Sequence, residues 1–300
     1  MTASVLARPS RLRAFASLCK LRVNSLIVFT AMVGMLLAQP GLPPALRFAA
    51  ACLGIGLVAC AAAAINCLIE RTVDARMART RGRPLPRGDL APAEALAAAM
   101  ALGGAGLYTL HTWVNDLTLW LTLATFLGYA VVYTAILKPA TPMNIVIGGA
   151  AGAMPPLLGW AAMSDRVTVQ AVALFLIIFL WTPPHFWTLC MARRDDYAKA
   201  GFPMLPLTHG LAHTCRQCLV YVVLLSGASL LPLPLGMAGP AYAAAVLPLD
   251  AVFLLRSHRL LRRYSDQASW RLFRYSIFYL LALFAALFLD RMLATWTALT

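Results

Sequence analysis

The sequence predicts an all-α polytopic membrane protein, a bundle of about nine transmembrane helices around a central cavity that opens towards the cytoplasmic face. Three observations predict this fold class. Hydrophobic residues make up 61% of the 300 residues, and the mean hydropathy is +0.76. Charged residues make up only 12%, whereas a soluble domain carries about 25%. The apolar residues gather in runs long enough to cross about 30 Å of hydrocarbon. A soluble enzyme, a disordered protein and a secreted disulfide scaffold are therefore excluded.

Nine apolar runs predict the membrane spans, and none shows the alternation of a β-barrel strand. The first run follows a basic N-terminal segment, residues 1–22. No convincing cleavage site of small residues follows that run, so we expect a retained helix and not a signal peptide. Residues 23–296 are expected to form a single transmembrane domain. The predicted spans are approximately 23–38, 48–68, 91–110, 117–137, 143–163, 168–190, 217–236, 239–256 and 274–295.

Two of these spans contain residues that disturb a helix. The fifth has three glycines, which let neighbouring helices approach closely, and a double proline, which must break or bend the helix. These residues are Gly148, Gly149, Gly152, Pro155 and Pro156. The sixth has Pro183 and Pro184 just before His185, and we expect them to bend the helix so that the histidine points into the cavity.

The cationic residues predict the orientation, because cytoplasmic loops carry an excess of Lys and Arg. With the N-terminus inside, all 25 Lys and Arg residues except Arg47, Arg166 and Arg291 fall in predicted cytoplasmic segments. This places the N-terminus in the cytoplasm and the C-terminus in the periplasm of a bacterial inner membrane. The net charge of +14 then reflects topology and anionic lipid, and nucleic-acid binding is not expected.

A first acid cluster follows the second span. Asn66, Glu70 and Asp74 lie four residues apart, which places them on one face if the helix continues through them. Three oxygen donors near the membrane boundary suit a hard divalent cation, and the following Arg79 and Arg83 suit phosphate oxygens. Because Mg²⁺ usually binds through one or two carboxylates plus substrate phosphates, the pattern indicates a diphosphate ligand. The alternative is a set of helix-end charges that pair with neighbouring arginines.

A second acid cluster follows the sixth span. Asp195 and Asp196 stand between Arg194 and Lys199, with Tyr197 beside them. An Asp-Asp pair flanked by cations is a second candidate for metal and phosphate binding. Both clusters end even-numbered spans and lie on the same predicted membrane face. Acids from the two loops can therefore face one cavity and hold Mg²⁺ ions that bridge a diphosphate.

The first cluster, followed by Met-Ala-Arg-Thr-Arg-Gly-Arg-Pro-Leu, resembles the first motif of the UbiA-type intramembrane prenyltransferase superfamily. Within that superfamily, the chain is most similar to the branch that farnesylates haem. The resemblance spans about residues 15 to 292. Four stretches give the narrower likeness: 77–80, 141–149, 181–187 with 194–197, and 272–279.

The resemblance implies a reaction, a metal and partners. It implies transfer of the farnesyl group of farnesyl diphosphate to a vinyl group of haem B, with addition of water, giving haem O and diphosphate for terminal oxidases. Ionisation of the allylic C–O bond would be helped by a divalent cation, Mg²⁺, while haem B is a substrate and not a cofactor. The implied partners are farnesyl diphosphate, haem B and membrane lipid, with haem A synthase or the terminal oxidase assembly as a further candidate.

The motifs and the resemblance together nominate the site residues. The candidate catalytic residues are Asn66, Glu70, Asp74, Asp195, Asp196 and Tyr197, and all of these except Tyr197 are also the candidate metal ligands. The candidate substrate-binding residues are Arg79, Arg83, Lys138, Asn144, His185, Arg194 and Lys199. The chain departs from the family pattern at four places. Glu70 stands where many members have Asp, and Cys67 replaces the Asn or Asp that often follows the first Asn. Pro139 follows Lys138 where a second basic residue is common, and Lys199 stands where a second Asp would complete an Asp-x3-Asp motif.

Several alternatives stay open at the level of sequence. His185 and His209 are rival candidates for the haem contact. Tyr197, Tyr133 and His185 are candidates for the group that positions the attacking water. An aromatic prenyltransferase acting on a quinone precursor would share the acid motifs and differ in its acceptor. A multi-pass transporter is the remaining class, although transporters usually place their acids near the membrane midplane.

Overall fold

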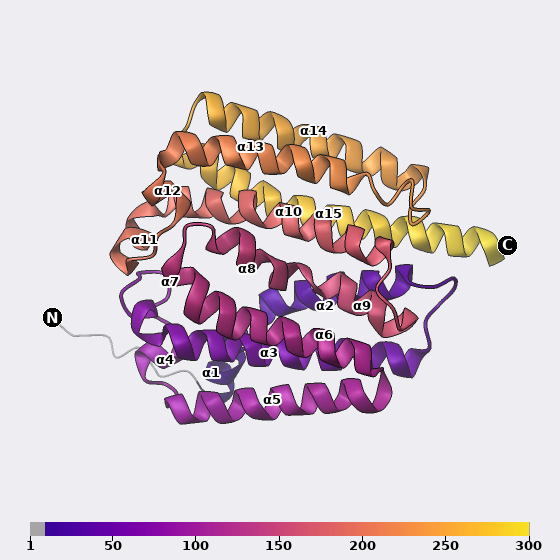
Figure 1. The fold of residues 1–300 in the computed structure, drawn as a ribbon, viewed down its shortest axis with the longest axis horizontal. Helices are drawn as coiled ribbons and strands as arrows, with labels where there is room; N and C mark the ends of the chain where they lie inside the picture. Colours follow the sequence, from indigo (N-terminus) through magenta and orange to yellow (C-terminus); the bar gives the residue numbers. More distant parts are fainter. Residues whose placement is uncertain (1–9, 300) are drawn as a thin grey trace.

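The structure is a computed structural model that describes residues 10–299, and these residues form helices and no strand (Figure 1). The elements are α1 (Arg11–Leu18), α2 (Leu21–Leu37), α3 (Ala45–Asp74), α4 (Pro84–Arg87), α5 (Pro92–Trp113), α6 (Asp116–Leu127), the π-helix η1 (Gly128–Leu137), α7 (Lys138–Ala140), α8 (Asn144–Ala153), α9 (Pro155–Ser164), α10 (Val169–Ala192), α11 (Arg194–Ala200), α12 (Leu205–Thr208), α13 (Gly210–Ser229), α14 (Pro240–Arg262) and α15 (Asp266–Leu299).

The predicted multi-pass helical fold is confirmed. Eight helices within the described residues are long and apolar enough to cross a membrane, and the bent pair α1 and α2, at 48° to each other, brings the number to nine. Several boundaries differ from the prediction. α3 continues to Asp74, α13 begins at Gly210 and ends at Ser229, and α15 begins at Asp266. These helices extend past their apolar runs because polar residues can continue a helix beyond the hydrocarbon.

The fourth span contains a feature that the sequence did not predict. After α6, residues Gly128–Leu137 adopt a π-helix, and α7 follows it directly. The Thr134 hydroxyl donates to the carbonyl oxygen of Tyr129 at 2.8 Å, and the Tyr129 and Tyr133 rings stack at 5.7 Å. A π-helix rotates the following residues relative to an α-helix, and such segments are frequent at functional sites. Here it precedes Lys138, the first residue of α7.

The double proline interrupts the fifth span as predicted. The helix stops at Met154, and Pro155 and Pro156 begin α9. Two close approaches hold α9 against α2. A Cβ on Gly34 would collide with the Pro156 carbonyl oxygen, and one on Gly159 would collide with the Ala31 carbonyl oxygen. Glycine is therefore required at both positions for the backbones to meet.

The predicted glycine contacts in α8 are confirmed at two of three positions. Gly148 packs against the ring of Tyr133, and Gly149 packs against Thr182 of α10. Gly152 has open space where a Cβ would be, so it makes no close approach. The first two glycines thus join α8 to the π-helix on one side and to α10 on the other.

The sixth span runs as one helix where the sequence predicted a bend. α10 continues from Val169 to Ala192 with Pro183 and Pro184 inside it. The two prolines therefore do not end the helix, and the bend at His185 stays a prediction. The Thr188 hydroxyl lies 2.8 Å from the carbonyl oxygens of Pro184 and His185, and α10 is packed along its length by α8, α13 and α15. The packing against these three helices surrounds the segment in which the prolines remove two backbone hydrogen bonds.

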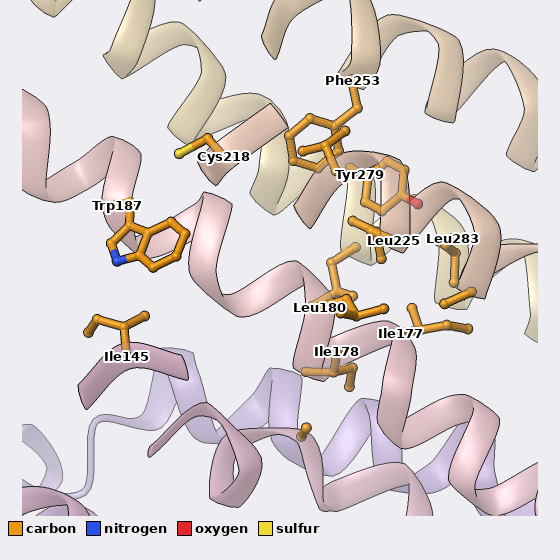
Figure 2. Packing of buried hydrophobic residues seen from close by; sticks show 14 of the residues in the cluster. Ile145, Ile177, Ile178, Leu180, Trp187, Cys218, Leu225, Phe253, Tyr279 and Leu283 are labelled. Carbon is orange, nitrogen blue, oxygen red and sulfur yellow. The ribbon is translucent and has the colours of Figure 1, made fainter. Parts of the chain in front are cut away.

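The largest hydrophobic cluster joins α8 and α10 to the C-terminal helices. Figure 2 shows Trp187 of α10 opposite Ile145 of α8, with Phe253 and Tyr279 close together on α14 and α15. A buried acid, Asp250, lies in this cluster. Its carboxylate accepts hydrogen bonds from Tyr279 at 2.6 Å and from Ser229 at 2.7 Å. Because both donors come from neighbouring helices, Asp250 links α13, α14 and α15.

Six elements form a closed cycle of contacts. α2 packs on α3, α3 on η1, η1 on α8, α8 on α10, α10 on α15, and α15 returns to α2. The short helices α4, α7, α11 and α12 all lie at one end of the bundle (Figure 1). Both acid clusters are therefore at the same end, as the sequence predicted. The cavity and its cytoplasmic opening stay predictions.

The cation distribution gives an expected result for membrane topology. With nine crossings and a cytoplasmic N-terminus, a reporter that is active only outside the cytoplasm should be active when it is fused after Thr300. The same reporter fused after Gly88, between α4 and α5, should be inactive. Reporter activity measured in intact cells checks both positions. Reporter activity after Gly88 and none after Thr300 would show that the protein has the opposite orientation in the membrane.

Candidate active site

The first acid cluster forms a buried row on α3. Asn66, Glu70 and Asp74 are 3%, 8% and 3% exposed, respectively. Because α3 extends through Asp74, the four-residue spacing places all three on one helix face, as the sequence predicted. We call these three residues the α3 row. Burial of two carboxylates is costly unless they are paired, so their partners determine what the row can do.

Each member of the α3 row contacts a cation from a different segment. Lys20, between α1 and α2, donates to Asn66 Oδ1 at 2.6 Å. Lys138 Nζ lies 2.5 Å from Glu70 Oε1. Arg83 Nη1 lies 2.6 Å from Asp74 Oδ2.

Further contacts fix the ends of the α3 row. The Asn66 side-chain amide donates to the Thr134 hydroxyl of the π-helix at 3.1 Å. The Thr80 hydroxyl donates to the Asp74 backbone carbonyl at 2.9 Å, which folds the loop back onto the end of α3. Three cations face two carboxylates, so the cluster has an excess of positive charge. Such a cluster attracts a polyanion.

Lys138 connects the two loops that the sequence predicted to meet. Its ammonium contacts Glu70 and also lies 4.7 Å from the ring centroid of Phe202, in the loop after α11. An ammonium over an aromatic face is a favourable cation–π contact. The π-helix places Lys138 between α3 and the second loop. The phosphate-binding role of Lys138 stays a prediction.

Tyr197 is the buried aromatic residue of α11 in the second loop. It is buried, and its hydroxyl lies beside the Cys190 thiol without a conventional hydrogen bond. Burial raises the pKa of the Tyr197 phenol, as does the Cys190 thiol, so the group is neutral at physiological pH. Its ring contacts that of Phe186 in α10, with ring centroids 6.1 Å apart.

The other predicted residues of the second loop have partners elsewhere. Asp195 is exposed, and Asp196 pairs with Arg193 at 3.4 Å. Arg194 binds Asp266 of α15 at 2.7 Å. Lys199 is exposed and has no ion pair among the described residues. The structure thus gives these four residues no direct contact with the α3 row.

Asn144 begins α8 and is fully buried. Its side-chain nitrogen donates to the Thr141 carbonyl at 2.5 Å, while its Oδ1 has no hydrogen-bond partner. A buried amide oxygen without a donor costs free energy, and such positions often receive water or a ligand. This is consistent with the substrate-binding role that the sequence assigned to Asn144.

His185 lies on the face of α10 that packs against α15. Its ring is stacked between Trp181, at 4.2 Å, and Phe273, at 4.8 Å. Its Nδ1 lies 2.7 Å from the Ser276 hydroxyl. That hydroxyl already donates to the Phe273 carbonyl at 2.6 Å, so it accepts from His185 Nδ1–H. The neutral ring therefore keeps its lone pair on Nε2, the form that binds a metal ion.

The rival histidine has a different environment. His209 is exposed at the start of α13, and its ring packs against His213 at 5.2 Å. Its Nδ1 contacts the Thr208 hydroxyl at 2.9 Å. No aromatic sandwich encloses it, so His185 is the better-enclosed candidate.

The donor chemistry of the α3 row fits Mg²⁺. Its members offer one amide and two carboxylate oxygens on a single face, the ligand type that Mg²⁺ prefers. Among residues 10–299, no three His, Cys, Asp or Glu side chains gather closely enough to form a metal site unaided. That is consistent with an ion held by a few protein oxygens and completed by substrate phosphates and water.

Sequence reasoning missed three contacts of the site. Lys20 was counted only as a topology signal, although its left-handed backbone at the α1–α2 junction places it on Asn66. Phe202 and Ser276 carry no charge and belong to no motif of catalysis. Nothing in the local pattern predicts their contacts, because their partners Lys138 and His185 are far away in the chain.

Curated proteins of high similarity span nearly the whole chain. One is the protoheme IX farnesyltransferase of Dechloromonas aromatica (strain RCB), 64% identical over 283 residues, which covers 94% of this chain and 95% of that protein. Another, of the same name, is from Thiobacillus denitrificans (strain ATCC 25259 / T1) and is 60% identical over 93% of this chain and 94% of its own length. A third, from Bordetella avium (strain 197N), is 52% identical over 99% of this chain and the whole of its own length.

Solved structures share the fold at low sequence identity. Digeranylgeranylglyceryl phosphate synthase superposes with a TM-score of 0.80 at 19% identity, covering 94% of this chain and 99% of that one. A UbiA homologue from Archaeoglobus fulgidus bound to DMAPP and Mg²⁺ gives 0.66 at 17% identity, over 92% of this chain and 97% of that one. The model of the UbiA prenyltransferase family matches residues 27–296. From this match and the curated relatives, we conclude that the chain belongs to the UbiA prenyltransferase family.

Proposed function

We propose that this chain transfers the farnesyl group of farnesyl diphosphate to a vinyl group of haem B, with addition of water, and releases haem O and diphosphate. The observation that carries the proposal is the buried α3 row with its three cations, a site suited to a diphosphate. The relatives named protoheme IX farnesyltransferase, which match nearly the full chain, support haem B as the acceptor.

The cations of the α3 row would hold the diphosphate end of the substrate. When the allylic C–O bond breaks, both electrons leave with the diphosphate, and negative charge grows on its oxygens. Lys20, Lys138 and Arg83 are already positioned around one helix face, so they stabilise that charge without reorganisation. Arg79 lies close to the same region, near Tyr197.

A divalent cation belongs to this proposal as well. Asn66, Glu70 and Asp74 would hold Mg²⁺, with Asp195 and Asp196 as the proposed second contribution, and the bound ion would supply charge stabilisation to the leaving diphosphate. The solved homologue with DMAPP and Mg²⁺ supports divalent-metal use in this fold. Lys138 pairs with Glu70, and Arg83 pairs with Asp74. A bound divalent cation would compensate these carboxylates in their place, and the lysine and the arginine could then contact phosphate oxygens.

The acceptor end needs an apolar enclosure and one polar group. The terminal vinyl carbon forms a bond to the allylic carbon, which leaves a cation on the vinyl carbon next to the porphyrin. One water adds its oxygen there and loses a proton. Tyr197 is the candidate that we favour for positioning this water, because its neutral hydroxyl is buried without a conventional hydrogen bond.

His185 is proposed to bind the iron of the haem substrate through Nε2. His185→Ala should lower haem affinity or shift the haem absorbance, while farnesyl diphosphate binding survives, because the ring packs against α15 and does not contact the α3 row. Ser276→Ala keeps the imidazole ring but removes the hydrogen bond that fixes its tautomer. We therefore expect a smaller change in haem affinity or absorbance, in the same direction. Titrations followed by absorbance check both variants, with His213→Ala as the control. Normal haem binding in His185→Ala and its loss in His209→Ala would make His209 the ligand.

The phosphate assignment gives a separate expectation for Arg83 and Asp196. Arg83→Ala should raise the KM for farnesyl diphosphate at least about tenfold, because one charged hydrogen bond to phosphate contributes about 1.5–3 kcal/mol. Asp196→Ala should also weaken farnesyl diphosphate use, and haem B affinity should change little in both variants. Arg87→Gln is the matched control, since Arg87 pairs with Asp89 in the same loop at 3.2 Å. Equal loss of haem affinity in both variants would show a disturbed fold.

The acceptor is tested by product analysis. Purified protein in lipid nanodiscs is incubated with Mg²⁺, farnesyl diphosphate and either haem B or 4-hydroxybenzoate, and products are identified by mass. The proposal expects haem O from the first mixture and no prenylated product from the second. Prenylated 4-hydroxybenzoate without haem O would assign the chain to quinone-precursor chemistry.

The location and partners follow the same proposal. Residues 23–296 would form one catalytic domain in a bacterial inner membrane, with the N-terminus cytoplasmic and the C-terminus periplasmic. Both substrates dissolve in lipid, so a site within the membrane with its phosphate end at the cytoplasmic surface suits them. Haem O would then pass to haem A synthase or to terminal oxidase assembly.

A further inference from the structure

A groove lies at the cytoplasmic-loop end of α15, outside the α3 row. It is a shallow, open depression lined by Gln267, Trp270 and Arg274, which all belong to α15. We propose that this groove receives haem B before farnesyl transfer, with a propionate carboxylate on Arg274 and the porphyrin face along Trp270. This inference rests on the proposed function, because it names where the acceptor substrate binds.

A continuous series of rings connects the groove to His185. The Trp270 and Phe273 rings meet edge to face at 5.5 Å. Phe273 then stacks on His185 at 4.8 Å, and His185 stacks on Trp181 at 4.2 Å. A porphyrin is a large flat aromatic ring, so it packs well along such a surface. The same series leads from the outer side of α15 to α10, one of the six elements of the contact cycle.

The charges around the groove suit a dicarboxylate. Arg274 is exposed and has no ion pair among residues 10–299. The Arg193 guanidinium lies 5.1 Å from the Trp270 ring centroid, and its ion pair with Asp196 is long, at 3.4 Å. The nearby acid Asp266 is engaged by Arg194 and by Tyr264. One arginine therefore lines the groove and a second contacts its tryptophan, while haem B carries two propionates on one edge.

The groove also faces the side from which a lipid-soluble substrate arrives. Ile277, Phe278 and Leu281 follow Arg274 on α15 and are 42%, 55% and 48% exposed. Exposed apolar residues on a membrane helix face the lipid. An anionic lipid headgroup would use the arginine alone, whereas a porphyrin uses the arginine and the rings together. The combination favours haem B.

The test separates the propionates from the ring. Wild-type protein in phosphatidylcholine nanodiscs is titrated with haem B and with haem B dimethyl ester, and binding is followed by absorbance. We expect the ester to bind at least tenfold more weakly. Arg274→Gln should raise the Kd of haem B about tenfold and leave the Kd of the ester unchanged. Trp270→Leu should weaken both ligands. Arg262→Gln, an exposed arginine at the end of α14, is the control and should bind like wild type.

Two results would overturn the inference. Equal affinity of wild-type protein for haem B and for its dimethyl ester would show that the protein does not recognise the propionates. Arg274→Gln protein that binds haem B like wild type would show that the groove does not bind haem B. If that variant also loses binding of phosphatidylglycerol, the groove is a lipid site. The proposed function is tested separately, by haem O formation in wild-type protein. If no haem O forms but the protein still binds haem B more tightly than the ester, the proposed function is wrong and the groove still binds haem B.

Discussion

Asp74→Asn is expected to abolish haem O formation, with a loss of at least about 100-fold in kcat/KM. The carboxylate is 3% exposed, pairs with Arg83 and belongs to the proposed metal ligands. Removing one preorganised electrostatic group from an active site costs about 10²–10³ in rate. Asparagine keeps the shape and removes the charge, so the substitution measures what the charge contributes. Product formation by purified protein in nanodiscs is the measurement.

A matched control distinguishes loss of charge from loss of fold. Asp89→Asn changes an aspartate of the same loop that also pairs with an arginine, Arg87, outside the α3 row. It should keep near wild-type turnover. The thermal unfolding temperature of both variants should stay close to that of wild type. Full activity in folded Asp74→Asn protein would contradict the role of the α3 row.

The Lys138 and Glu70 pair gives the second large effect. Lys138→Gln leaves the Glu70 carboxylate buried without its cation, and an uncompensated buried charge costs about 3–5 kcal/mol. We therefore expect a clear fall in the unfolding temperature together with loss of farnesyl diphosphate turnover. Thermal unfolding in nanodiscs and product formation measure the two effects.

The double variant separates stability from catalysis. Glu70→Gln combined with Lys138→Gln removes both charges, so the unfolding temperature should recover towards that of wild type. Turnover should not recover, because diphosphate loses a cation and the metal loses a ligand. Recovery of turnover in the double variant would reduce the pair to a structural ion pair.

The α3 row could be predicted because its information is local. Asn66, Glu70 and Asp74 share one helix, and a spacing of four residues is enough to place them on one face. The prediction also required the helix to continue beyond its apolar run, and α3 does continue to Asp74. The alternative of simple helix-end charges is not what the structure shows, since Arg83, Lys20 and Lys138 are the partners and not the adjacent arginines.

The partners of the α3 row could not be predicted because they depend on tertiary structure. Lys20 is 46 residues before Asn66, and Lys138 is 68 residues after Glu70. The π-helix that precedes Lys138 has no sequence rule that distinguishes it from an α-helix of the same apolar composition. The continuity of α10 through Pro183 and Pro184 could not be predicted for the same reason. Packing on three sides holds α10 together against the local preference of proline.

The second acid loop shows a limit of charge patterns. Asp195, Asp196 and Arg194 read as a metal and phosphate cluster, yet Arg194 binds Asp266 on α15. The buried residue of this loop is Tyr197, and a single tyrosine gives no signal in a charge pattern. The contribution of Asp195 and Asp196 stays a prediction that the Asp196→Ala variant tests.

The measurement that tests the central claim most directly is farnesyl diphosphate binding by isothermal titration, without haem, in the presence of Mg²⁺ and then of a chelator. The claim is that the α3 row and its three cations hold the diphosphate with a divalent ion. It predicts tight binding by wild-type protein with Mg²⁺, much weaker binding with the chelator, and weak binding by Asp74→Asn in both conditions. Equal affinity of wild type and Asp74→Asn with Mg²⁺, unaffected by the chelator, would contradict it.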